Sequence, residues 1–116
     1  MEYIEIQQEV LEILRAASGS FLSAYQVCQD IEKNNDALWS RLTDAYPSID
    51  TPVPMGTGTG RHYSPASFVA GALAHFTRSR EIPGLRQEMF SCGGVVFSGI
   101  GACNTEKAIG IWAITT

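Results

Sequence analysis

The stretch Gly56-Thr57-Gly58-Thr59-Gly60-Arg61-His62-Tyr63-Ser64-Pro65 leads into the most clearly signalled helix of the chain. Ser64 can cap a helix because its hydroxyl accepts from the backbone of the first turn, and Pro65 suits the first helical position. Tyr63 and Phe68 stand at the two positions of a hydrophobic staple. We therefore predict a helix over residues 65–77, against which the other elements pack.

The predicted helix 65–77 has two distinct faces. Large apolar side chains recur at helical spacing on one face, which indicates a surface turned to the core. These residues are Phe68, Val69, Ala72, Leu73 and Phe76. A neighbouring strip of small residues would let another helix approach closely, either the first helix of this chain or the same helix of a second copy in a two-fold dimer. The strip consists of Ala66, Ala70 and Ala74, with Ser67 and Gly71 beside them.

The alternating glycines of residues 56–60 suggest a phosphate ligand. Backbone N–H groups ahead of a helix N-terminus bind anions, and Arg61 would add a positive charge. A P-loop, however, requires Gly-Lys-Ser/Thr at the helix start and a preceding strand, and a dinucleotide site requires a βαβ unit. The sequence has none of these, so the pattern favours a surface loop.

Three further helices are predicted before Pro47. Residues 3–17 carry apolar side chains at helical spacing. Residues 24–32 follow the pattern Ser23-Ala24-Tyr25-Gln26, which has the spacing of a capping box. Residues 36–46 can be capped by Asn35 and end at the proline. This third helix is expected to bury Leu38, Trp39, Leu42 and Ala45.

The pattern changes after Pro83-Gly84. Met89-Phe90, residues 94–98 and residues 108–114 are rich in residues that favour strands. The loop 99–107 between the last two is too long for a tight turn and would project as a flap.

This order of elements resembles a winged-helix domain, a helix-turn-helix relative closed by a β-hairpin wing. The resemblance rests on the capped helix after Phe21-Leu22, the capped helix at Ser64-Pro65 and the closing strands that end in Ile111-Trp112-Ala113-Ile114. It implies an α+β fold of three to four helices closed by a small antiparallel hairpin or sheet. Residues 1–116 would form a single domain with an insertion at about 33–63. Helix 65–77 would be the recognition-type helix. The alternative, helix 36–46, follows a shorter break but lies far from the wing.

Composition indicates one soluble domain. Of the 116 residues, 45% are hydrophobic and 17% are charged, which suits a packed core better than a disordered chain. No apolar run approaches the roughly 20 residues that span a bilayer, and the acidic start lacks a signal-peptide layout. Cys28, Cys92 and Cys103 have no metal-binding spacing and suggest a reducing compartment. We therefore expect a cytoplasmic protein with no membrane association, metal or cofactor.

Charge is unevenly distributed along the chain, whose net charge is −4. Residues 1–50 hold nine acids and three bases, whereas residues 51–116 hold three acids and five bases, so an anion could be bound by the second half. In the winged-helix interpretation, Ser67, Gly71 and His75 face outward on the recognition helix. The candidate nucleic-acid contacts are Arg61, His62, Ser67, His75, Arg78, Arg80 and Lys107. Helix 65–77 lacks Arg, Asn and Gln, the usual base readers, so binding is expected to be weak and salt-sensitive.

The sequence does not indicate enzyme chemistry. His62 and His75 fit no metal-ligand spacing with the cysteines, and capping already accounts for Ser64. We predict a non-enzymatic binding module that contacts nucleic acid through helix 65–77 and the wing. The alternative is a homodimeric interaction or adaptor domain without a nucleic-acid role.

Overall fold

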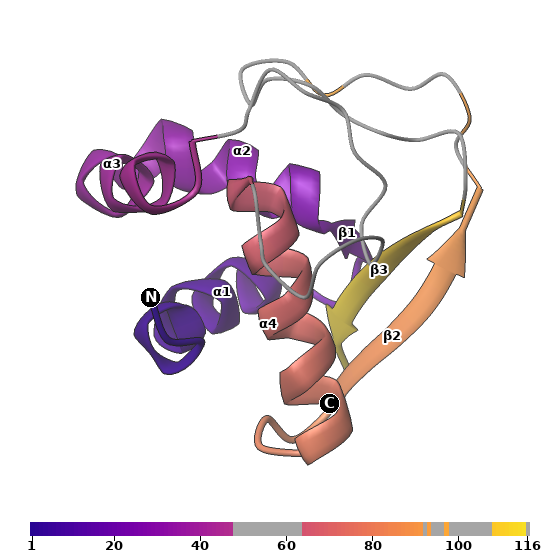
Figure 1. Cartoon of the computed structure of the whole chain (residues 1–116). Coiled ribbons are helices and arrows are strands. Elements are labelled where there is room, and N and C mark those ends of the chain that lie inside the picture. Colours follow the sequence, from indigo (N-terminus) through magenta and orange to yellow (C-terminus); the bar gives the residue numbers. More distant parts are fainter. Residues whose placement is uncertain (48–63, 92, 94–96, 98–107, 116) are drawn as a thin grey trace.

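Four helices and a three-stranded antiparallel sheet make up an α+β fold (Figure 1). The computed structural model describes residues 1–47, 64–91, 93, 97 and 108–115. The class expected from the sequence is therefore confirmed for these residues. In chain order the elements are α1 (Ile4–Ala16), β1 (Leu22–Ser23), α2 (Ala24–Asn34), α3 (Asp36–Ala45), α4 (Pro65–Ser79), β2 (Leu85–Phe90) and β3 (Ile109–Ile114).

Three of the helices begin at the caps that the sequence predicts. At the start of α2, the backbone N–H of Gln26 donates to Ser23 Oγ at 3.1 Å, and the backbone N–H of Ser23 donates to Gln26 Oε1 at 2.9 Å. Asn35 and Ser64 each accept a bond of 3.1 Å from the backbone N–H three residues later, at the starts of α3 and α4. The predicted staple of α4 involves Tyr63, which lies outside the described residues. The local chemistry therefore sets these helix starts, because each cap satisfies a backbone donor that the helix leaves unpaired.

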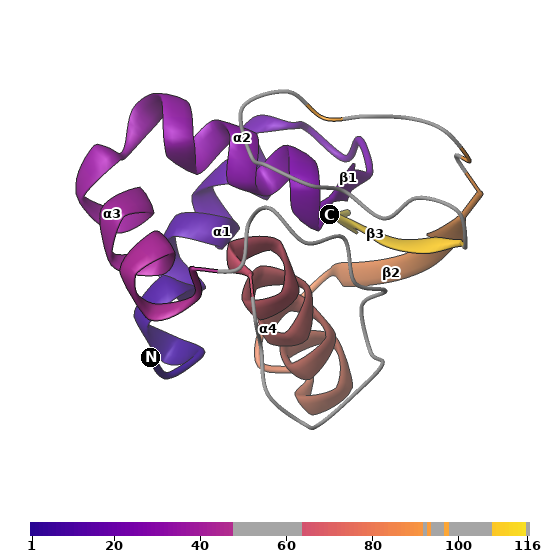
Figure 2. The same cartoon turned by 45° about the horizontal axis from the view of Figure 1, so that its top comes forward.

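The sheet has β3 at its centre, in the order β1-β3-β2 (Figures 1 and 2). The two residues of β1 pair antiparallel with β3, with Leu22 opposite Trp112. β2 pairs antiparallel with β3 along its full length, from Leu85 opposite Ile114 to Phe90 opposite Ile109. The helices lie to one side of this sheet, and β2 is the strand farthest from β1.

The sequence predicted only part of the strand that pairs with β3. That strand is β2, of which only Met89-Phe90 was predicted, and the predicted strand 94–98 lies outside the described residues except for Phe97. Phe97, the one described residue of 94–98, lies in no strand, and its ring stacks on Tyr25 at a centroid distance of 5.1 Å. β2 begins as Leu-Arg-Gln-Glu and has five exposed residues, so it lacks the apolar alternation by which a half-buried strand is recognised.

The side chain of Trp112 on β3 forms a cross-strand contact with β2. Its Nε1 donates to Oε1 of Gln87 on the opposite strand at 3.2 Å. The indole lies over Gly110, where an added Cβ would be 2.7 Å from Trp112 Cη2. Glycine at position 110 therefore makes room for a tryptophan that is only 3% exposed.

The core lies between the helices and the sheet, and α4 contributes most to it. Every residue predicted for the apolar face of α4 is buried: Phe68, Val69, Ala72, Leu73 and Phe76. They pack with residues of α1, α2, α3 and β3, and the helix that α4 contacts most closely is α2. In α3, Leu38 and Leu42 are buried as expected, Trp39 is partly buried, and Ala45 is exposed, contrary to prediction. A helix at the margin of a fold buries only one stripe of side chains, and Ala45 is the last residue of α3, past the last buried residue of that stripe, Leu42.

Cys28 lies in the core and has no exposed surface. Cys92 and Cys103 lie outside the described residues. Within the described ranges, no helix has both the length and the apolar character needed to span a membrane.

Candidate functional site

Of the candidate nucleic-acid contacts in the described part of the chain, Arg78 and Arg80 are exposed, His75 is partly exposed and Ser67 is buried. Arg61, His62 and Lys107 lie outside the described residues, as do the glycines of 56–60 and the loop 99–107. Ser67 was expected to face outward, but it is 7% exposed. All five residues from Pro65 to Val69 are buried, so the first turn of α4 is covered on every side and presents no reading face there.

His75 lies on the partly exposed side of α4 but is engaged within its own chain. Its ring centroid is 5.4 Å from that of Tyr3, near the start of α1. Its Nε2 is 3.8 Å from Oε1 of Glu81, which forms an ion pair when the imidazole is protonated. These contacts indicate that His75 helps hold the end of α4 against its neighbours.

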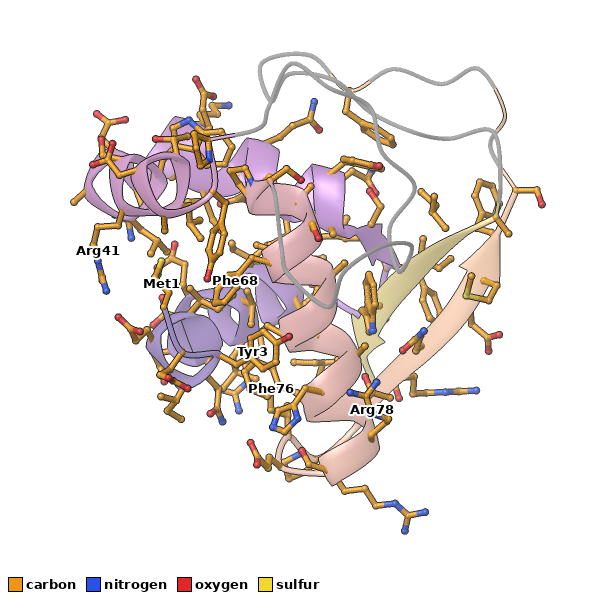
Figure 3. All side chains as sticks on the ribbon, in the orientation of Figure 1. Met1, Tyr3, Arg41, Phe68, Phe76 and Arg78 are labelled. Atoms are coloured by element: carbon orange, nitrogen blue, oxygen red, sulfur yellow. The ribbon has the colours of Figure 1, made fainter. Side chains whose placement is uncertain are left out.

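Exposed positive charge is concentrated at the C-terminal end of α4. Arg78 and Arg80 are both exposed, and Arg80 ends the helix in the left-handed conformation, with φ of 58°. Figure 3 shows Arg78 at this end of the helix, close to the start of β2. Arg86 on β2 adds a third exposed guanidinium. Two carboxylates moderate this charge, since Glu81 lies near His75 and Glu88 Oε1 is 4.0 Å from Arg86 Nη2.

The strip of small residues on α4 packs mainly within its own chain. Ala66 is buried in the core, and Ala70 and Ala74 are partly buried against it. Gly71 is partly exposed. Within the described residues, the helix that α4 contacts most is α2, whereas the sequence suggested the first helix, α1.

An aromatic cluster joins α1, α4 and the residue after α3. Phe68 stacks on Tyr46 at a centroid distance of 4.8 Å and contacts Tyr3 at 5.2 Å (Figure 3). Partial burial raises the pKa of Tyr46 above its ordinary value, and the neighbouring Tyr3, Glu5 and Glu2 raise it further. The cluster therefore favours the neutral phenol, which suits packing better than proton transfer.

An ion pair outside this cluster ties α3 to α1. The Arg41 guanidinium bonds the carboxylate of Glu5, and Asn35 Nδ2 donates to Glu9 Oε2 at 3.2 Å. The pKa of Glu5 is lowered, chiefly because its carboxylate accepts from the backbone N–H of Glu2 and also because Arg41 is near. These contacts hold α3 against α1.

The most unusual surface lies on β2, which sequence reasoning did not single out. Met89 and Phe90 are 61% and 54% exposed, and with Ile4 they are the large hydrophobic side chains that the described part of the chain leaves open to solvent. Arg86, Gln87 and Glu88 beside them are exposed as well. We refer to Arg86–Phe90 as the β2 edge. The alternation of Arg86 and Glu88 around Gln87 was the available sequence signal, because charged residues are typical of edge strands.

Within the described residues, no three His, Cys, Asp or Glu side chains are grouped closely enough to hold a metal ion. The arrangement of the described residues thus offers contact surfaces, one basic and one of mixed apolar and charged character.

Comparison with known proteins found no match among protein-family models, curated proteins or solved structures.

Proposed function

We propose that the chain is a non-enzymatic binding module of winged-helix layout, which contacts another protein chain through the β2 edge. The layout is supported by the order of the elements, in which α4 leads by a short turn into the β2–β3 hairpin and β1 adds to the other side of β3. In this layout α4 takes the place of the recognition-type helix, and α3 belongs to the insertion at about 33–63. Because one layout serves many functions, the function is argued from the surface.

The observation that carries the proposal is the exposure of Met89 and Phe90 on an edge strand. Burying large apolar side chains in a complex is favourable because it removes their surface from water. An edge strand also offers backbone groups to which an extended segment can add as a further strand. The two features together favour a protein partner. On α4, in contrast, the first turn is covered, His75 is engaged with Glu81, and the exposed charge is that of Arg78 in the last turn.

Site-directed photo-cross-linking tests this proposal. A photo-reactive phenylalanine analogue at position 90 is expected to cross-link another protein chain in cells, because Phe90 lies in the proposed contact. The same analogue at the exposed Ala37 of α3 serves as the matched control and should give no such product. Adding Met89→Lys should remove the product from position 90. Equal cross-linking at positions 90 and 37 would contradict the proposal.

Duplex nucleic acid is the second candidate, supported by the exposed Arg78, Arg80 and Arg86 at the end of α4 and on β2. Phosphate contacts from such residues are independent of sequence and weaken with salt. The double variant Arg78→Ala with Arg80→Ala is expected to reduce the slope of log affinity against log salt by about 2. Arg15→Ala, an exposed arginine on α1, should leave the slope unchanged. If the unmodified protein shows no salt-dependent binding in electrophoretic shift or anisotropy measurements, this candidate is excluded.

A further inference from the structure

The backbone at the outer side of β2 is arranged to accept another strand. The backbone N–H of Thr115 donates to the carbonyl of Gly84 at 2.9 Å, so the backbone carbonyl of Gly84 is directed toward β3. Backbone groups alternate in direction along an antiparallel ladder. Arg86, Glu88 and Phe90 therefore direct theirs to β3, whereas Gln87 and Met89 direct theirs outward. The carbonyl of Leu85 is also directed outward, while its N–H donates to the carbonyl of Ile82 at 3.3 Å. In the described part of the chain, β3 is the one strand that pairs with β2.

The sequence of β2 is complementary to itself in one antiparallel register. If two copies of β2 pair about a two-fold axis at Gln87, Arg86 of each copy lies opposite Glu88 of the other. Leu85 then lies opposite Met89 of the second copy, and Gln87 lies opposite itself. Opposite charges and apolar pairs placed directly across a ladder are both stabilising.

Neighbouring registers lack this complementarity. A two-fold axis at Arg86 sets two guanidinium groups directly opposite, and an axis at Glu88 sets two carboxylates opposite, which is destabilising. Intermediate registers would place outward-directed backbone groups against inward-directed ones. Charges on edge strands usually discourage pairing between copies. In β2 the same charges favour the register centred on Gln87 and disfavour the registers centred on Arg86 and on Glu88.

We infer that the partner of the β2 edge is a second copy of this chain, joined through antiparallel β2–β2 pairing centred on Gln87. This inference rests on the proposed function, because it names the occupant of the same surface. The pairing joins two three-stranded sheets into one six-stranded sheet. Figure 1 shows room for it, since β2 lies at the margin of the molecule with β3 and the helices on its inner side. Because the contact is one strand deep, we expect an association that depends on protein concentration.

Charge exchange between Arg86 and Glu88 tests the register. Both side chains are well exposed, 61% and 57%, so their replacement should not disturb the fold. Arg86→Glu places like charges opposite at two points, as does Glu88→Arg, and each variant should weaken self-association about tenfold. An equimolar mixture of the two variants should associate again, because each Glu then faces an Arg of the other chain. The double variant R86E/E88R should also self-associate. Sedimentation equilibrium measures all four samples.

Amide hydrogen exchange provides a measurement that needs no variant. The amides of Gln87 and Met89 should exchange rapidly in dilute protein and more slowly as its concentration rises. Those of Arg86 and Glu88 should be slow throughout, because they already face β3. Protection of all four amides that does not change with concentration would overturn the inference.

The remaining outcomes separate this inference from the proposal on which it rests. A chain that stays monomeric but is cross-linked from position 90 to a different protein overturns the inference and leaves the protein-binding proposal intact. A monomer with no specific cross-link from position 90 contradicts both. If the chain forms a dimer whose stability is insensitive to the charge exchanges, the dimer interface lies on another surface, for example on the small residues of α4. This result would also overturn the inference.

Discussion

Replacing Phe68 with alanine is expected to lower the free energy of unfolding by about 3–5 kcal/mol, the largest effect among single substitutions considered for this chain. Phe68 is 1% exposed and lies between Tyr46 and Tyr3. The substitution would open a cavity where α4, α1 and the end of α3 meet, and would also remove two aromatic contacts. Urea denaturation followed by circular dichroism would measure the loss.

The matched control for this prediction is Phe90→Ala. It removes the same side chain from a position that is 54% exposed, so in dilute protein the free energy of unfolding should change by no more than about 0.5 kcal/mol. A similar loss in both variants would contradict the assignment of Phe68 to the core and Phe90 to the surface.

Replacing Gly84 with alanine is expected to lower the free energy of unfolding by about 2–5 kcal/mol, from backbone strain and overpacking together. Gly84 has φ of 81°, a conformation that disfavours a Cβ. An added Cβ would also lie 2.3 Å from the carbonyl oxygen of Thr115. Because that oxygen belongs to the backbone, the turn before β2 must move away from the end of β3. The hydrogen bond from Thr115 N to Gly84 O would weaken as a result.

Gly19→Ala separates the two contributions to this loss. Gly19 has φ of 87°, but the nearest atom to its added Cβ is the oxygen of Ile114 at 4.0 Å. It therefore combines the same backbone strain with open space, and should lower the free energy of unfolding by about 1 kcal/mol. Equal losses at positions 19 and 84, measured by urea unfolding of both variants, would show that the clash with Thr115 is absent.

The candidate surface was harder to predict than the helices, for a physical reason. Arg78 and Arg80 are exposed, as expected for charged residues at the end of a helix. Ser67, in contrast, is buried, although its position on the helical wheel suggested that it would face solvent. A prediction of exposed residues from hydrophobic periodicity assumes that one face of the helix is open to solvent. That assumption fails for the first turn of α4, where five successive residues are covered. The β2 edge was missed because its exposure removes the alternation that marks a strand.

Local chemistry in the sequence determined where helices begin and which face of α4 enters the core. Ser23 with Gln26, Asn35 and Ser64 cap their helices through hydrogen bonds that span three residues, and such bonds depend on neighbours in the chain. The tertiary structure alone decided that Leu22-Ser23 joins β3 and that the polar segment Leu85–Phe90 is an edge strand. Strand pairing links residues far apart in sequence, Leu22 with Trp112 for example, and no local pattern records which partner a strand will meet.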